Sequence, residues 1–162
     1  MKLKGNKKYN TQRGSLMVEI IVASAIITMV VIAASVVAQK AVSLSRQSVH
    51  QAQAALLLEE GAESVRIVRD NAWSNISSLT AATDYYISFS GGTWVISTTP
   101  NQVGIFTRKI TFSPAYRDGS QNLSASGTLD SQTSLVSVIV SWTEGGQAVS
   151  KTLQFYITDL FS

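Results

Sequence analysis

Residues 15–38 form a continuous apolar segment in which Glu19 is the only charged side chain. At a rise of 1.5 Å per residue, a helix of this length extends about 36 Å, and the hydrocarbon core of a bilayer is about 30 Å thick. Such a segment is expected to be covered by lipid or by other apolar helices. The sequence therefore predicts a membrane-spanning helix followed by a separate domain.

The carboxylate of Glu19 has two interpretations. A charge inside an apolar helix costs about 2.5–3.5 kcal/mol on insertion scales, unless it reaches water near the headgroups. The alternative is that the carboxylate pairs with a cation in a water-excluded assembly. Cleavage after Gly14 would create such a cation, the free amino terminus of Ser15. The helix axis separates the two groups within one chain, but staggered chains would bring them together.

The stretch Gly14-Ser-Leu-Met-Val-Glu19, between a lysine-rich leader and an apolar helix, resembles the class III signal of type IV prepilins. The resemblance implies that a prepilin peptidase cleaves after Gly14 and N-methylates Ser15, and that Glu19 registers each incoming subunit in the filament. The chain departs from the common family pattern at three points. Ser15 stands where phenylalanine is more frequent, no proline precedes Pro100, and there is no cysteine for a C-terminal disulfide.

Residues 1–14 hold five of the 13 basic residues of the chain and none of its 10 acidic ones. Positive charge before an apolar helix predicts that the N-terminus stays in the cytoplasm and that the rest is exported. The net positive charge of the chain therefore comes from a segment that orients the helix in the membrane, and direct nucleic-acid binding is not expected. An ordinary secretory signal, cut near residues 33–35, would instead release a soluble protein, but the length of the apolar run and Glu19 argue against it.

Residues 39–73 are expected to continue the helix, from about Leu16 to Asn71, because apolar side chains recur at spacings of 3, 4 and 7. Two stripes result. They are Val42, Val49, Ala52 and Leu56, and then Leu58, Ala62, Val65, Val68 and Ala72. The C-terminal domain is expected to cover this half of the helix. The charged residues Glu59, Glu60, Glu63, Arg66 and Arg69, and the single histidine His50, are predicted to lie on a solvated face.

Residues 74–162 are predicted to be rich in strands. A connector over 74–83 precedes a hairpin around Gly91-Gly92, in which Phe89 pairs with Trp94 and Ile87 with Ile96. A third strand is expected over 105–113 and an exposed loop over 114–133. The last hairpin turns at Gly145-Gly146, and its predicted pairs are Val136–Phe155, Val138–Leu153, Val140–Lys151 and Trp142–Val149. This hairpin also resembles the closing hairpin of minor pilins of the pilus-modification type and of secretion-system pseudopilins.

The expected fold class is α+β and type IV pilin-like. A long N-terminal helix packs against a small antiparallel sheet of about four to five strands. The chain divides into a basic leader (1–14), a transmembrane or filament-core half of the helix (15–38), an amphipathic half (39–73) and a β-rich head (74–162).

No catalytic, metal-binding or cofactor-binding site is expected. One histidine and no cysteine cannot build the common zinc or iron sites. Asp118, Gly119 and Asp130 lack the alternating carboxylates of a calcium loop, so a turn is predicted there.

Three functions remain open: a structural minor subunit of a type IV filament machine, a single-pass anchored adhesin or binding module, and an anchored hydrolase. The resemblance favours the first, which implies as partners the prepilin peptidase, other pilin subunits, the inner-membrane assembly platform and, before assembly, the lipid bilayer. The expected location is the cytoplasmic membrane and then the pilus surface. Cleavage after Gly14 separates this function from the other two.

Overall fold

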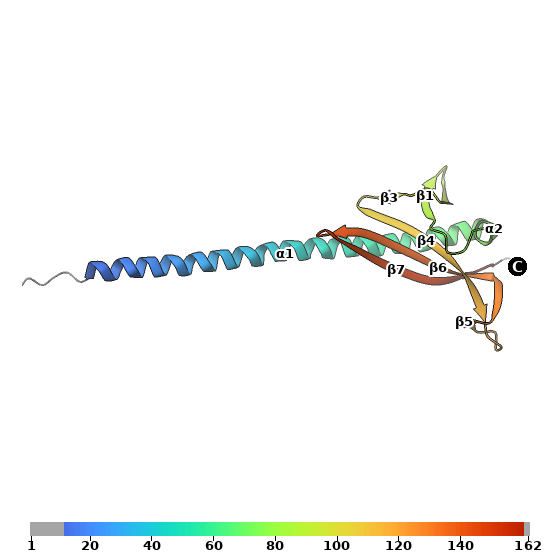
Figure 1. Ribbon diagram of the computed structural model, residues 1–162. Coiled ribbons are helices and arrows are strands. Elements are labelled where there is room, and N and C mark those ends of the chain that lie inside the picture. Colours follow the sequence, from blue (N-terminus) through green and yellow to red (C-terminus); the bar gives the residue numbers. More distant parts are fainter. Residues whose placement is uncertain (1–11, 161–162) are drawn as a thin grey trace, which may run out of the picture. The chain divides into compact units, whose positions relative to one another are not determined.

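The computed structural model describes residues 12–160, which form one long helix, a short helix and seven antiparallel strands (Figure 1). Helix α1 spans Gln12–Asn71 without a break, and α2 spans Ser74–Ser77. The absence of proline before Pro100 permits this length, because no backbone N–H is missing from the helical ladder. The α+β class is confirmed, and α1 ends at the expected Asn71. Residues 1–11 of the expected leader lie outside the described residues.

The chain divides into two compact units, residues 1–46 and 47–162. In the described part of the first unit, the large apolar side chains of α1 are more than half exposed, from 51% for Val22 to 72% for Met29. The helix is long and apolar enough to cross a membrane. The expected membrane-spanning capacity is therefore confirmed.

The second unit contains the strands. A two-stranded sheet pairs β1 (Tyr86–Ser90) with β2 (Thr93–Ser97). The larger sheet has the order β3-β4-β6-β7, with β5 pairing β4, and every pairing is antiparallel. Its strands are β3 (Gln102–Val103), β4 (Phe106–Arg117), β5 (Leu123–Ser124), β6 (Thr128–Glu144) and β7 (Gln147–Thr158). The larger sheet has five strands, within the expected four to five, and β1 and β2 form a separate sheet.

Both hairpin registers are confirmed. Phe89 pairs with Trp94, and Val138 with Leu153, as the two Gly-Gly turns predict. Gly145 and Gly146 have φ angles of 57° and 82°, which side chains rarely adopt, so glycine is required in this two-residue turn.

The prediction of an exposed loop over 114–133 is wrong at both ends, whereas residues 118–127 between the strands are largely exposed and contain only the two-residue β5. Strand β4 continues to Arg117, and β6 begins at Thr128. Pro114 is followed by a bulge, because Pro114 pairs with Ser134 but Ala115 pairs with Asp130. The segment is polar because much of it is exposed, so it lacks the apolar alternation that marks a half-buried strand. The expected connector over 74–83 likewise contains α2.

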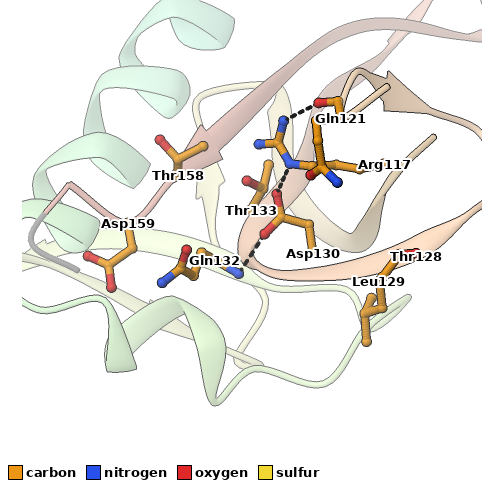
Figure 2. Close-up of a pocket in the computed structure, with 9 residues that line it drawn as sticks. All are labelled: Arg117, Gln121, Thr128, Leu129, Asp130, Gln132, Thr133, Thr158 and Asp159. Atoms are coloured by element: carbon orange, nitrogen blue, oxygen red, sulfur yellow. Dashed lines mark hydrogen bonds and ion pairs between the residues drawn. The ribbon is translucent and has the colours of Figure 1, made fainter. Parts of the chain in front are cut away.

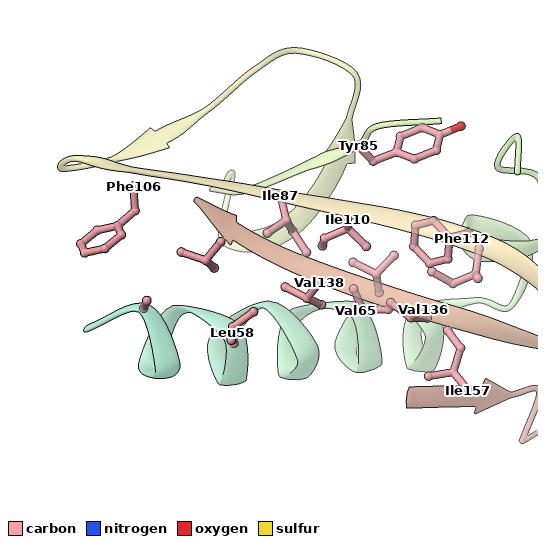
Figure 3. Packing of buried hydrophobic residues seen from close by; sticks show 14 of the residues in the cluster. Leu58, Val65, Tyr85, Ile87, Phe106, Ile110, Phe112, Val136, Val138 and Ile157 are labelled. Atoms are coloured by element: carbon pink, nitrogen blue, oxygen red, sulfur yellow. The ribbon is translucent and has the colours of Figure 1, made fainter. Parts of the chain in front are cut away.

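The core lies between the second half of α1 and one face of the larger sheet (Figure 3). Leu58 and Val65 of α1 face Val136 and Val138 of β6. The predicted stripe of Leu58, Ala62, Val65 and Val68 is buried, as expected. The expectation that the domain covers the other stripe is wrong, because Val42, Val49, Ala52 and Leu56 are all exposed. Ala54 lies in the core instead.

Candidate functional site

The residues of the predicted processing motif all lie in α1. The backbone of Gly14 is helical, and the side chains of Ser15 and Glu19 are exposed. Ser15 and Glu19 are four residues apart, so they share one helix face. Both line a shallow apolar depression on that face, together with Val18, Val22, Ala23 and Ile26. The structure therefore places Ser15 beside Glu19 on one side of the helix, so the expectation that the helix axis separates them within one chain is wrong for these two residues.

Hydroxyl side chains within the apolar segment are satisfied by the helix itself. Ser24 Oγ donates to the carbonyl oxygen of Ile21 at 2.9 Å, and Thr28 Oγ1 donates to that of Ser24 at 2.7 Å. Glu19 forms no hydrogen bond or ion pair through its side chain within residues 15–160, whose side chains the structure describes. Its carboxylate thus differs from the hydroxyls, because the helix offers no donor for it and a partner has to come from another group.

His50 does not lie on a solvated face, contrary to the prediction. Its Nδ1 contacts Glu144 Oε2 at the end of β6, and its ring meets the edge of Phe106 at a centroid distance of 6.2 Å. Trp142 Nε1 also donates to Glu144 Oε2, at 3.2 Å. The only histidine therefore joins α1 to the last hairpin within the second unit, a long-range contact that helical periodicity does not reveal.

Glu60 lies on the exposed face, as the sequence predicts, but it is also the ion-pair partner of a buried arginine. Arg108 of β4 is 4% exposed, and its Nη1 donates to Glu60 Oε2 at 2.9 Å and to the carbonyl oxygen of Leu57 at 3.3 Å. The guanidinium carbon also lies 5.9 Å from the ring centroid of Trp94. These contacts compensate a charge that would otherwise be costly to bury. Glu63 and Arg66, three residues apart, form an ion pair on the exposed surface of α1, where both were expected to be solvated.

A polar pocket of about 440 Å³ lies where β4 and β7 end and β6 begins (Figure 2). Arg117 of β4 donates from Nε to Asp130 Oδ2 at 2.7 Å and from Nη1 to the carbonyl oxygen of Gln121 at 2.8 Å. Asp130 Oδ1 accepts from the backbone N–H of Gln132 at 3.0 Å. The Thr133 hydroxyl and the Arg117 guanidinium lower the pKa of Asp130, since both favour its ionised form.

Thr133 lies at the base of this arrangement. It is 4% exposed, and its hydroxyl faces the Asp130 carboxylate, whose ionised form it favours. Thr158, which pairs with Thr133 across the strands, and the following Asp159 line the same pocket. No local sequence pattern marks this pocket, because the bulge between β4 and β6 creates it.

The turn predicted around Asp118 is confirmed. Asp118 Oδ1 accepts from the backbone N–H groups of Ser120 and Asn122 at 2.8 and 2.9 Å, and these bonds lower the pKa of Asp118. Within residues 12–160, no group of three or more histidine, cysteine, aspartate or glutamate side chains is placed to hold a metal ion.

Comparisons with protein-family models, with curated proteins and with solved structures found no match to this chain.

Proposed function

We propose that the chain is a structural minor subunit, a minor pilin or pseudopilin, of a type IV pilus or related filament machine. In this proposal the prepilin peptidase cleaves after Gly14, and the mature chain starts at Ser15. The head is exported, and the apolar part of α1 stays in the membrane until it enters a filament. The observation that supports the proposal most is the motif from Gly14 to Glu19 at the start of an exposed apolar helix.

The exposed surface of α1 is consistent with two successive environments. Before assembly, lipid would cover the apolar side chains, and one carboxylate costs far less than the many apolar residues contribute. In a filament, neighbouring apolar helices would replace the lipid. Glu19, which has no side-chain partner among residues 15–160, would then pair with the amino terminus of its own or a neighbouring subunit.

A second candidate function is a single-pass anchored adhesin or binding module. The polar pocket beside Asp130 is one place on the head where such a module could hold a ligand. The two functions are compatible, since a filament subunit can present a binding site on its head.

The test separates three pools of the chain in cells that possess the filament machinery: cleaved, membrane-bound and filament-associated. Glu19→Ala and Glu19→Gln should leave insertion and cleavage nearly intact and lower the filament pool at least about tenfold, equivalent to about 1.4 kcal/mol. The amide keeps the shape of the side chain but loses its charge. Glu59→Gln, at an exposed position of the same helix, is the matched control. Equal filament pools for all forms would refute the registry role of Glu19.

A further inference from the structure

Within the head unit, one apolar face of α1 is not covered by the sheet. Val49 and Leu56 are 52% and 65% exposed, and Ala52 between them is exposed as well. Leu58, two residues after Leu56, points to the opposite side of the helix and is buried. The head therefore leaves this face of α1 in water, and contiguous exposed apolar surface is characteristic of protein–protein contacts.

A groove beside Leu56 enlarges this apolar surface. Val103 and Ile105, on either side of Gly104 between β3 and β4, line the groove and are 40% and 52% exposed. The histidine that lines it, His50, is held by Glu144 of β6. The surface therefore offers apolar contact rather than charge to a partner.

The exposed face repeats every seven residues along α1. Thr28, Ser35, Val42, Val49 and Leu56 are each seven residues apart and all exposed, and we call them the α1 seam. Positions 31, 38, 45 and 52, which lie between them on the same face, hold only valine, alanine or serine. A seven-residue repeat of this kind, sustained without a charged residue, is typical of two helices that wind around each other.

The two hydroxyl side chains of the α1 seam are compatible with a close contact between helices. Thr28 Oγ1 donates to the carbonyl oxygen of Ser24 at 2.7 Å, and Ser35 Oγ donates to that of Val31 at 2.9 Å. Both hydroxyls are therefore satisfied without water or a second helix. Small side chains such as these let helix backbones approach closely inside a membrane.

We propose that two copies of this chain pair in parallel along the α1 seam. In a parallel pair each seam residue faces the same residue of the second copy, so a seam without charged residues brings no like charges together. Copies that are anchored through the same apolar segment enter the membrane in the same direction, which excludes an antiparallel pair. The pairing concerns the anchored chain before any assembly and does not depend on cleavage after Gly14.

The experiment is disulfide cross-linking of the full-length chain, which has no cysteine of its own. Val49→Cys lies on the seam, and Gln51→Cys, at an exposed position two residues further on, points to the opposite side of α1. Each variant is expressed with two different tags in cells that lack a prepilin peptidase, and the membranes are oxidised. Val49→Cys should give at least about fivefold more linked dimer of the two tagged copies than Gln51→Cys, since only facing seam residues come within disulfide range.

A second substitution tests the seam from its other end. Leu56→Glu, added to Val49→Cys, should lower the dimer fraction about tenfold, equivalent to about 1.4 kcal/mol, because it places two carboxylates opposite each other. Gln51→Glu in the same background adds the same charge on the opposite side of α1 and should leave the dimer fraction unchanged. The proposal is overturned if Val49→Cys and Gln51→Cys cross-link equally, if Val49→Cys links to another protein instead of the second copy, or if Leu56→Glu and Gln51→Glu have the same effect.

Discussion

Gly61 of α1 lies so close to Val138 of β6 that a Cβ atom at position 61 would be 2.8 Å from Val138 Cγ1. The same atom would be 3.1 Å from Cδ of Arg108. Val138 is fully buried, so it has little room to move. Glycine in a helix costs about 1 kcal/mol relative to alanine. At position 61, glycine is needed because α1 and β6 approach too closely to leave room for a Cβ atom.

Gly61→Ala should destabilise the head by about 1–2 kcal/mol. Overpacking a core typically costs about 1–3 kcal/mol, and because the buried Val138 has no room to move we expect about 2–3 kcal/mol here, from which a gain of about 1 kcal/mol in helix propensity is subtracted. The measurement is urea unfolding followed by circular dichroism. Gly119→Ala is the control, since a Cβ atom there would meet nothing within 4 Å. A Gly61→Ala variant as stable as the wild type would contradict the packing described for α1.

Glu60→Gln should destabilise the head by about 1–3 kcal/mol, because the buried guanidinium of Arg108 would lose its charged acceptor. The neighbouring Glu59 is exposed, and Glu59→Gln should stay within about 0.5 kcal/mol of the wild type. The same denaturation measurement compares the two. Equal stability of both variants would mean that the ion pair between Glu60 and Arg108 contributes nothing.

The ionised carboxylate of Asp130 should stabilise the folded head at neutral pH, and this stabilisation should be lost in acid. Its pKa is lowered from the ordinary value of 3.8, so the ionised form is favoured in the folded state. The resulting stabilisation is complete above about pH 3.8 and is lost as the pH falls through the folded-state pKa. Thermal melts at several pH values should show Asp130→Asn less stable than the wild type near neutral pH, with the difference vanishing in acid. Asp70→Asn, at an exposed carboxylate, is the comparison, and a difference for Asp130→Asn that grows in acid would contradict the assignment.

Much of the fold could be predicted from local sequence. The stripe through Leu58 and Val65 has helical spacing, and the Gly-Gly pairs set both hairpin registers, so short-range rules suffice for these elements. The end of β4 after Pro114 and the start of β6 could not be predicted in this way. They pair with each other, but their side chains do not alternate between apolar and polar.

Side-chain contacts between distant segments were equally hidden. His50 and Glu144 are 94 residues apart, and Glu60 and Arg108 are 48 apart, so no spacing rule connects them. The pocket at Thr133 depends on a bulge that no turn signal marks. The motif from Gly14 to Glu19 is the opposite case, because all of its residues lie within two helical turns and the sequence alone displays it.

The most direct test of the proposed function is the mass of the N-terminal peptide of the chain extracted from cells that express a prepilin peptidase. We predict a mature chain that begins at Ser15, with residues 1–14 removed, and a Gly14→Val variant that retains Met1, since a side chain at position 14 should block the close approach of the peptidase. Gly119→Val, far from the motif in sequence, should be processed like the wild type. A wild-type chain that still begins at Met1 would contradict the proposal that this protein is a processed filament subunit.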